Sequence, residues 1–242
     1  MSRAAAPIVL ERDERVVTLT FDRPDVLNAY DRAMRDAVFG ALEWLHAEPE
    51  VSVLVVRGNG RAFSTGGDLS EFGTAPSPVR AREIRRQRDV WRLWSTLPCV
   101  SIAAVHGHAV GGGLEMALLC DLIVCAHDAR FALPETGLGL VPGVGGTQTL
   151  PRAIGAGRAA EVLLAGAALD GRTAARIGLA QRSVPATRLR ATADRLARRV
   201  AALDPALVRA AKACVQRGSD LPLADGLGLE RRIASALRPR SR

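Results

Sequence analysis

Two glutamates in apolar, glycine-rich sequence are the residues of this chain best suited to acid–base chemistry. Glu115 ends residues 110–115 (VGGGLE), and Glu135 ends residues 131–135 (FALPE). Burying a carboxylate is costly unless it has a partner or a function. If the two converge on one site, one can act as base and the other as acid. The structural alternatives are a favourable contact of Glu115 with a helix dipole, and a cap or surface ion pair for Glu135.

Three consecutive glycines, Gly111 to Gly113, precede Glu115 and are expected to open a short helix that runs through Leu119. Glycine lets a ligand approach the backbone closely, and the first turn of a helix leaves N–H groups unpaired at the positive end of its dipole. Such groups suit an anion or a developing oxyanion. The alternative is tight packing of this helix against a strand. The segment fits neither the G-x-G-x-x-G dinucleotide fingerprint nor the phosphate-loop motif.

A second glycine-rich turn, residues 61–69 (RAFSTGGDL), directly follows an apolar segment that is expected to form a buried strand. Loops at the carboxyl ends of strands are the usual ligand sites of α/β proteins, so this turn is a candidate source of a second backbone N–H. Ser64 is not expected to be a nucleophile, because the G-x-S-x-G elbow is absent. Asp68 is interpreted as a helix cap rather than a catalytic acid.

The histidines and cysteines do not form a recognisable metal site. His106 and His108 would share one face of a strand, but no carboxylate or cysteine at a recognised spacing completes a ligand set. The chain has four cysteines, at Cys99, Cys120, Cys125 and Cys214. They lie in apolar sequence without paired spacing, which is typical of reduced, structural cysteines in a cytosolic protein. The sequence therefore predicts no metal.

The net charge of +8 over 242 residues is unevenly distributed. Residues 1–151 contain 15 basic and 18 acidic side chains, whereas residues 152–242 contain 18 basic and 7 acidic ones. A basic half is able to bind nucleic acid or a membrane surface, but no nucleic-acid motif or aromatic interleaving accompanies it. The first residues lack the apolar region of a signal peptide, and no apolar run reaches the ~18 residues of a membrane span. We expect a cytoplasmic protein without nucleic-acid or membrane partners.

The first 150 residues alternate between strand and helix patterns. Strands are expected at residues 16–21, 51–57, 100–105 and 122–126. A helix capped by Asp31 should run to about His46, and a charged helix should span residues 78–94 before Pro98. This alternation predicts an α/β body.

After Thr147 the pattern becomes helical. Helices are expected at residues 159–164, 173–177, 187–202, 205–216 and 221–237, with one short strand at 180–184. Hydrophobic residues make up 48% of the chain, which is enough for an ordinary buried core. The expected fold class is α/β with a helical C-terminal extension.

Taken together, these segments resemble the crotonase superfamily, that is, the enoyl-CoA hydratase/isomerase family. The resemblance covers about residues 8–235 and rests on independent motifs in the family's order. They are residues 23–24 (RP), 27–29 (LNA), 62–69 (AFSTGGDL), 102–107 (IAAVHG), 111–117 (GGGLEMA), 120–121 (CD), 134–135 (PE) and 142–148 (PGVGGTQ). The resemblance implies a crotonase-like spiral of ββα units at residues 1–190, and a helical, trimerisation-type extension at residues 191–242.

Members of this family bind acyl-CoA thioesters. The resemblance implies that the N–H groups of Gly67 and Gly112 hold the thioester oxygen and stabilise the enolate. Glu115 would act as general base toward water, and Glu135 would deliver a proton to the α-carbon. The implied substrate and CoA contacts are Ala29, Gly67, Asp68, Leu69, Ser70, Gly112 and Gly143, the last of which helps to place the water. No metal or redox cofactor is implied, because the thioester itself acidifies the α-carbon and coenzyme A enters as part of the substrate.

Because both glutamates are present, the resemblance favours an enoyl-CoA hydratase, which adds water across the 2,3 double bond of a 2-enoyl-CoA. The alternatives are double-bond isomerisation, which commonly relies on the equivalent of Glu135 alone, another acyl-CoA reaction such as decarboxylation, or non-catalytic CoA binding. A homotrimer, or a hexamer of two trimers, is implied. The family usually continues through a further helix after the equivalent of Ala236, whereas six residues follow here, so the extension is expected to be shortened.

Overall fold

A computed structural model describes residues 6–74, 77, 79, 83 and 87–237 of the chain. Its largest sheet has six strands in the order β1-β2-β3-β4-β6-β9. Their bounds are β1 Ile8–Asp13, β2 Val16–Phe21, β3 Val53–Gly58, β4 Val100–Val105, β6 Leu122–Ala126 and β9 Arg182–Val184. β1 pairs antiparallel with β2, and all later neighbours pair in parallel. The loops after the parallel strands therefore gather at one edge of the sheet.

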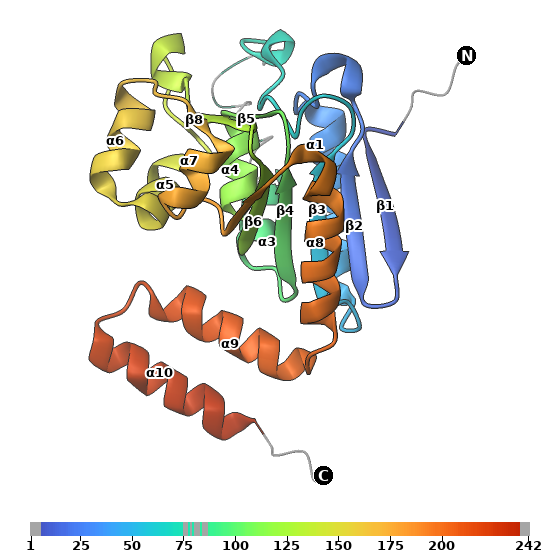
Figure 1. Cartoon of the computed structure of the whole chain (residues 1–242), viewed down its shortest axis with the longest axis vertical. Helices are drawn as coiled ribbons and strands as arrows, with labels where there is room; N and C mark the ends of the chain where they lie inside the picture. Colours follow the sequence, from blue (N-terminus) through green and yellow to red (C-terminus); the bar gives the residue numbers. More distant parts are fainter. Residues whose placement is uncertain (1–5, 75–76, 78, 80–82, 84–86, 238–242) are drawn as a thin grey trace.

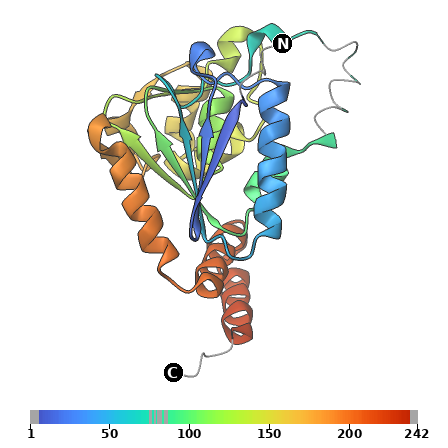
Figure 2. The same ribbon diagram turned by 90° about the vertical axis from the view of Figure 1, so that its right-hand side faces the viewer.

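Helices cover both faces of this sheet, which explains the continuous apolar sequence of its central strands. α8 (Ala186–Ala201) packs against one face, and α1 (Arg32–Ala47) lies on the opposite side (Figure 2). The Asp31 side chain accepts a hydrogen bond from Met34 N and caps α1, as the sequence predicted. The buried residues of α1 recur every three or four positions and form one apolar face: Met34, Val38, Ala41, Leu42 and Leu45.

A second, three-stranded sheet explains how the chain winds as a spiral. It consists of β5 (His108–Val110), β7 (Arg130–Ala132) and β8 (Leu169–Asp170), in that order. β4 is followed by β5 and then by α4 (Gly112–Leu118), and β6 is followed by β7 and the short helix η3 (Glu135–Leu138). In each unit the first strand joins the large sheet and the second joins the small one. This repeat confirms the predicted crotonase-like arrangement.

The remaining helices lie beside and below the two sheets (Figure 1). They are α5 Gly146–Ile154, α6 Ala156–Leu164, α7 Gly171–Arg176, α9 Pro205–Gly218 and α10 Leu223–Ala236. α9 and α10 pack against each other and extend away from the body (Figure 1). The predicted boundary at residue 190 falls inside α8, which packs on the sheet.

Several predicted elements need correction. The helix expected at residues 78–94 is not continuous, because α3 (Val90–Ser95) begins after Asp89, whose side chain caps it by accepting from Arg92 N. Part of that predicted helix lies outside the described residues. The sequence patterns also missed β1 and α5. Within the described part of the chain, no helix is long and apolar enough to cross a membrane.

Candidate active site

The Glu115 carboxylate is buried and held by backbone donors of a distant loop. Glu115 lies in α4, whose N-cap, Gly111, has a φ of +54°, in the left-handed region that favours glycine. Glu115 is only 2% exposed. Its Oε1 atom accepts hydrogen bonds from Val144 N at 3.0 Å and Gly146 N at 2.8 Å. Burial raises the pKa of Glu115; the two N–H donors oppose this rise, and the Glu135 charge adds to it.

Glu135 opens η3 and brings a second carboxylate to the start of α4. Its Oε2 atom is buried and has no hydrogen-bond partner among the described residues. A methyl group placed on Gly111 would lie 3.0 Å from Glu135 Oε1, so the carboxylate lies against the glycine that precedes the helix. Burial raises the pKa of Glu135. A buried, unpaired carboxyl oxygen with a raised pKa is typical of a group that exchanges a proton.

The two predicted backbone donors lie next to each other. Tyr30 forms a single β-bridge with Gly67: Tyr30 N donates to Gly66 O at 2.7 Å, and Asp68 N donates to Tyr30 O at 3.0 Å. These two bonds use the Gly66 carbonyl and the Asp68 N–H and leave the Gly67 N–H unused. Among the hydrogen bonds of the described residues, none uses the N–H of Gly67 or of Gly112. A methyl group on Gly112 would lie 3.7 Å from Gly67 N. Within the described residues, the two N–H groups are therefore free of protein acceptors and lie close together, as a pair of oxyanion donors requires.

Arg23 braces the segment that follows Gly67. Its guanidinium pairs with Asp68 at 3.3 Å and with Asp31 at 3.1 Å, and it also donates to Ala29 O. Asp68 accepts hydrogen bonds from the backbone and hydroxyl of Ser70, and these bonds lower its pKa, helped by Arg23. Asp68 is the N-cap of the short helix η2 (Leu69–Glu71), which confirms its interpretation as a cap.

Comparison with known proteins identifies the family that uses this arrangement. Residues 11–240 match the enoyl-CoA hydratase/isomerase family. The chain belongs to this family. It is 36% identical to a probable enoyl-CoA hydratase of Mycobacterium bovis over 93% of this chain and 87% of that protein. It is 35% identical to the 2,3-dehydroadipyl-CoA hydratase of Escherichia coli over 95% of this chain and 89% of that protein.

Solved structures agree with this assignment. An enoyl-CoA hydratase subunit from Geobacillus kaustophilus superposes with a TM-score of 0.90 at 38% identity, over 95% of this chain and 89% of that one. A putative enoyl-CoA hydratase from Thermobifida fusca, solved in complex with CoA, gives a TM-score of 0.89 at 32% identity, over 96% of this chain and 93% of that one. The chain is thus an enzyme of the crotonase superfamily, and the predicted family, fold and hydratase-type activity are confirmed at this level.

The donors that hold Glu115 come from the same loop as Gly143, the residue predicted to help place the water. Gly143 is exposed, and its neighbours Val144 and Gly146 donate to the Glu115 carboxylate. The sequence did not single out these two donors. A backbone N–H donor cannot be recognised from the type of its side chain. The only available signal was the glycine-rich composition of residues 142–147.

Exposed apolar side chains surround the entrance to the site. Leu69 is 67% exposed and Phe72 is 50% exposed, and the Phe72 ring lies 3.1 Å from the position of a methyl group on Gly67. After Glu135, Leu140 and Val141 are also exposed. Of two further predicted contacts, Ser70 lies in η2 beside Leu69, and Ala29 lies in the loop before α1, where its carbonyl accepts from Arg23. Such a cluster of apolar side chains beside polar donors is typical of a ligand site.

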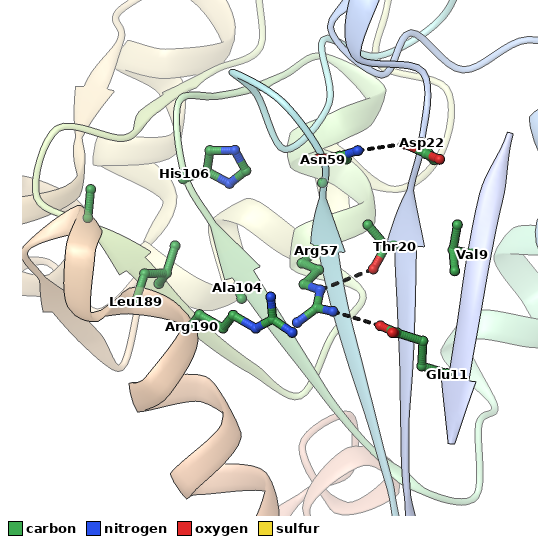
Figure 3. A pocket seen from close by; sticks show the side chains of 12 residues that line it. Val9, Glu11, Thr20, Asp22, Arg57, Asn59, Ala104, His106, Leu189 and Arg190 are labelled. Carbon is green, nitrogen blue, oxygen red and sulfur yellow. Dashed lines mark hydrogen bonds and ion pairs between the residues drawn. The ribbon is translucent and has the colours of Figure 1, made fainter. Parts of the chain in front are cut away.

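A separate cavity of about 440 Å³ lies between the large sheet and α8 (Figure 3). Arg57 crosses its floor and donates to Thr20 at 3.0 Å and to Glu11 at 2.8 Å. Arg190 of α8 points into the same space (Figure 3). Neither glutamate of the candidate site and none of the predicted oxyanion or CoA contacts line this cavity, so the enzyme's candidate site is distinct from it.

The histidines and cysteines lie elsewhere in the fold. His106 Nε2 lies 3.0 Å from Gly60 O, and His108 begins β5. Three of the cysteines are buried, and all four are free of disulfides. Within the described residues, no three side chains of His, Cys, Asp or Glu gather at metal-binding distance.

Proposed function

We propose that this enzyme is an enoyl-CoA hydratase that adds water across the 2,3 double bond of a 2-enoyl-CoA. The observation that carries the proposal is the pairing of Glu115, which is buried, with Glu135, whose Oε2 atom is buried: both have raised pKa values, and both adjoin the start of α4. Two carboxyls in such an environment divide the roles of base and acid. The chain's similarity to enoyl-CoA hydratases supports the same reaction.

The N–H groups of Gly67 and Gly112 would hold the thioester oxygen. When water attacks C3, negative charge moves onto this oxygen as an enolate forms, and two preorganised donors stabilise that charge more than the charge of the ground state. Removing one donor from such a site typically costs about 10²–10³-fold in rate. Glycine at these positions lets the substrate carbonyl approach the backbone closely.

Glu115 would orient the water and accept its proton as the oxygen–C3 bond forms. Its Oε1 atom is occupied by Val144 and Gly146, so Oε2 is the oxygen left to bind the water. Glu135, in its protonated form, would deliver a proton to C2 and collapse the enolate. One proton is gained by Glu115 and one is lost by Glu135, so the total number of protons on the pair is conserved.

The loops beside Gly67 would bind the CoA part of the substrate. The proposed contacts are Ala29, Asp68, Leu69 and Ser70. Arg23 fixes the loops that carry them, because it pairs with Asp68 and donates to Ala29 O. Gly143 remains a proposed contact at the rim of the site. We propose no metal or redox cofactor, since the thioester acidifies C2 without one.

A homotrimer, or a hexamer of two trimers, is the oligomeric state that we propose. No residue of α9 is buried in the single chain, and α10 buries only Leu229. The two helices and their connections expose a set of large apolar side chains: Leu203, Leu207, Val215, Leu221, Leu223 and Leu227. Apolar faces of this kind are typical of surfaces that pack in an assembly. We also propose a cytoplasmic location, which the disulfide-free cysteines favour.

One set of assays tests the reaction. The purified protein is offered 2-enoyl-CoA, 3-enoyl-CoA and malonyl-type thioesters, alongside the Glu115→Gln and Glu135→Gln variants. Hydration of 2-enoyl-CoA that is lost in both variants supports the proposal, whereas hydration that survives both substitutions contradicts it. Activity confined to 3-enoyl-CoA and lost only in Glu135→Gln would indicate an isomerase. CoA binding without turnover of any thioester would indicate a binding protein.

A further inference from the structure

Ser64 is fully buried beside the two proposed oxyanion donors, and its Oγ, N and O atoms are all hydrogen-bonded. Its Oγ atom donates to Asn28 O at 2.8 Å and accepts from Gly66 N at 3.2 Å. Its backbone N donates to His108 O at 3.0 Å, and its carbonyl accepts from Val110 N at 3.1 Å. One residue therefore contacts both the loop that ends in Gly67 and the strand that leads to Gly112.

The bond to Gly66 holds the Thr65–Gly66 peptide, which directly precedes the peptide that contains the Gly67 N–H. Gly66 has a φ of +84°, and a methyl group on it would lie 2.8 Å from Gly112 N. Its N–H is fixed by Ser64 Oγ, and its carbonyl is fixed by Tyr30 N at 2.7 Å. Because the peptide unit is planar and trans, a Gly66 carbonyl that points toward Tyr30 directs the Gly67 N–H the opposite way.

The acceptor of the Ser64 hydroxyl is itself immobile. Asn28 is fully buried and has a φ of +57°. Its Oδ1 atom accepts from Arg23 N at 2.8 Å, and its Nδ2 atom donates to Asn59 O at 2.9 Å and to Ala62 O at 2.8 Å. With its side chain fully bonded, Asn28 offers Ser64 an acceptor of fixed position.

The carbonyl of Ser64 also packs against the other donor helix. A methyl group on Gly113 would lie 2.2 Å from Ser64 O and 3.0 Å from Ser64 Cβ. Gly113 directly follows the proposed donor Gly112, so the start of α4 rests on Ser64. The residue consequently lies between the two proposed donors and touches the backbone of each segment.

We propose that Ser64 is a positioning residue of the oxyanion hole: its hydroxyl holds the Thr65–Gly66 peptide that leads to the Gly67 N–H, and its backbone sets the start of α4. This inference rests on the proposed hydratase function. Ser64 does not touch the substrate, because it is buried and its Oγ is engaged both as donor and as acceptor. Without Oγ, the Gly66 N–H loses its acceptor in a buried place, and only the bond from Tyr30 N to Gly66 O is left to orient the Gly67 N–H toward the thioester oxygen.

The test compares Ser64→Ala and Ser64→Cys with a matched control, Thr65→Val. Thr65 also carries a hydroxyl in the same loop, and this hydroxyl donates to Leu27 O at 3.4 Å rather than accepting from the Gly66 N–H. Steady-state kinetics with 2-enoyl-CoA give kcat and KM. The infrared stretching frequency of a bound saturated acyl-CoA, labelled with ¹³C at the thioester carbonyl, reports directly how strongly the two N–H groups polarise the oxygen.

We expect Ser64→Ala to lower kcat by about 10- to 100-fold with little change in KM, since small misplacements at a reacting centre have effects of this size. The carbonyl frequency of the bound thioester should move back toward its value in water. Ser64→Cys should fall between Ser64→Ala and the wild type, because a thiol is a weaker donor and acceptor. Thr65→Val should keep kcat and the frequency close to those of the wild type.

Two results would overturn the role of Ser64 while leaving the proposed function intact. The first is a Ser64→Ala enzyme whose kcat and carbonyl frequency equal those of Thr65→Val. The second is a Ser64→Ala or Ser64→Cys protein that loses thermal stability and activity but keeps the wild-type carbonyl frequency in its folded fraction. If Ser64→Ala does not fold, Ser64→Cys alone decides between these results. A wild-type protein that neither hydrates 2-enoyl-CoA nor shifts the carbonyl frequency contradicts the proposed function itself.

Discussion

The carboxylate of Glu115 lies directly against the backbone of Gly146, with Gly146 N donating to Oε1 at 2.8 Å. Gly146 is the first residue of α5, so the carboxylate receives its bond from the positive end of that helix. A methyl group on Gly146 would lie 3.0 Å from Oε1 and 3.1 Å from Cγ of the same glutamate. A larger residue at position 146 would therefore crowd the side chain of the proposed base.

Replacing Gly146 with alanine should damage catalysis with little effect on substrate binding. The added methyl group would also meet Leu133 Cδ1 at 3.1 Å, so it has no free space and must displace the Glu115 side chain. We expect kcat to fall by about 10- to 100-fold, as for other small misplacements of catalytic groups, with KM nearly unchanged. Gly157→Ala in α6, where nothing lies within 4 Å of the added methyl, is the control. Equal kcat values for the two variants would show that Gly146 does not orient the base.

Gly111 has the corresponding relationship to Glu135. Its φ of +54° and the 3.0 Å distance from an added methyl to Glu135 Oε1 predict two effects of Gly111→Ala: backbone strain and displacement of the proposed acid. Gly155→Ala separates them, because Gly155 has a φ of +82° but nothing within 4 Å of an added methyl. Both variants should melt at a lower temperature than the wild type. Only Gly111→Ala should also lower kcat, by about 10-fold or more; a similar loss of kcat in both would assign the effect to strain.

Glu115→Gln should make the protein more stable at neutral pH although it removes activity. Burial raises the pKa of Glu115 in the folded chain. Between the unfolded and folded pKa values the folded protein therefore binds more protons, and the free energy of unfolding falls as pH rises through this interval and stays lower above it. Glutamine carries no charge, yet its amide oxygen still accepts from Val144 and Gly146, so this destabilisation disappears.

Thermal unfolding at two pH values checks this sign. At pH 7 we expect the melting temperature of Glu115→Gln to exceed that of the wild type by a few degrees, since about 1 kcal/mol corresponds to about 2–4 °C in a chain of this size. Below the ordinary glutamate pKa of about 4.3 the difference should vanish. Glu43→Gln, at an exposed position of α1, controls for the change in net charge. A Glu115→Gln protein less stable than the wild type at pH 7 would refute the argument.

Much of the candidate site could be predicted because its proposed chemistry depends on residue types that are visible in the sequence. Both glutamates and the glycines at 67 and 112 are visible in the sequence as residue types. The neighbouring Gly113 is required by packing, because a methyl group on it would lie 2.2 Å from Ser64 O. The sequence also predicted the Asp31 cap and the helical spacing of apolar residues in α1, and β4 and β6 have the predicted bounds.

The features that escaped prediction have tertiary causes. β5 and β7 contain three residues each and are fixed by pairing with each other, so they are too short to show a period of two. The N–H groups of Val144 and Gly146 act through the backbone, and the valine gives no hint of this. The helix break at Asp89 depends on a side-chain cap within a charged run that otherwise favours helix.

Lys212, the only lysine of the chain, should be required to keep α9 on the body. Its Nζ atom donates to Asp121 Oδ2 at 2.6 Å and to Cys99 O at 2.7 Å, and its side chain is only 8% exposed. Asp121 also accepts from the Ser101 backbone and hydroxyl, and these bonds fix its carboxylate beside Lys212. Replacing Lys212 with methionine keeps most of the apolar stem but leaves the Asp121 charge without its ion-pair partner.

We expect Lys212→Met to lower the free energy of unfolding by about 2 kcal/mol, less than a fully buried pair because Asp121 is partly solvated. This corresponds to a fall of about 4–8 °C in melting temperature. Arg152→Met is the control, because the Arg152–Asp220 pair is mostly exposed and should contribute below about 1 kcal/mol.

Hydrogen exchange should show faster opening of α9 and α10 than of the sheet in Lys212→Met. Sedimentation should show weaker assembly, because α9 presents the apolar surface proposed to join the copies. Unchanged exchange in α9, with a melting temperature equal to that of Arg152→Met, would show that the other contacts of α9, among them the bond from Arg209 to Val51 O, are enough to hold the helix.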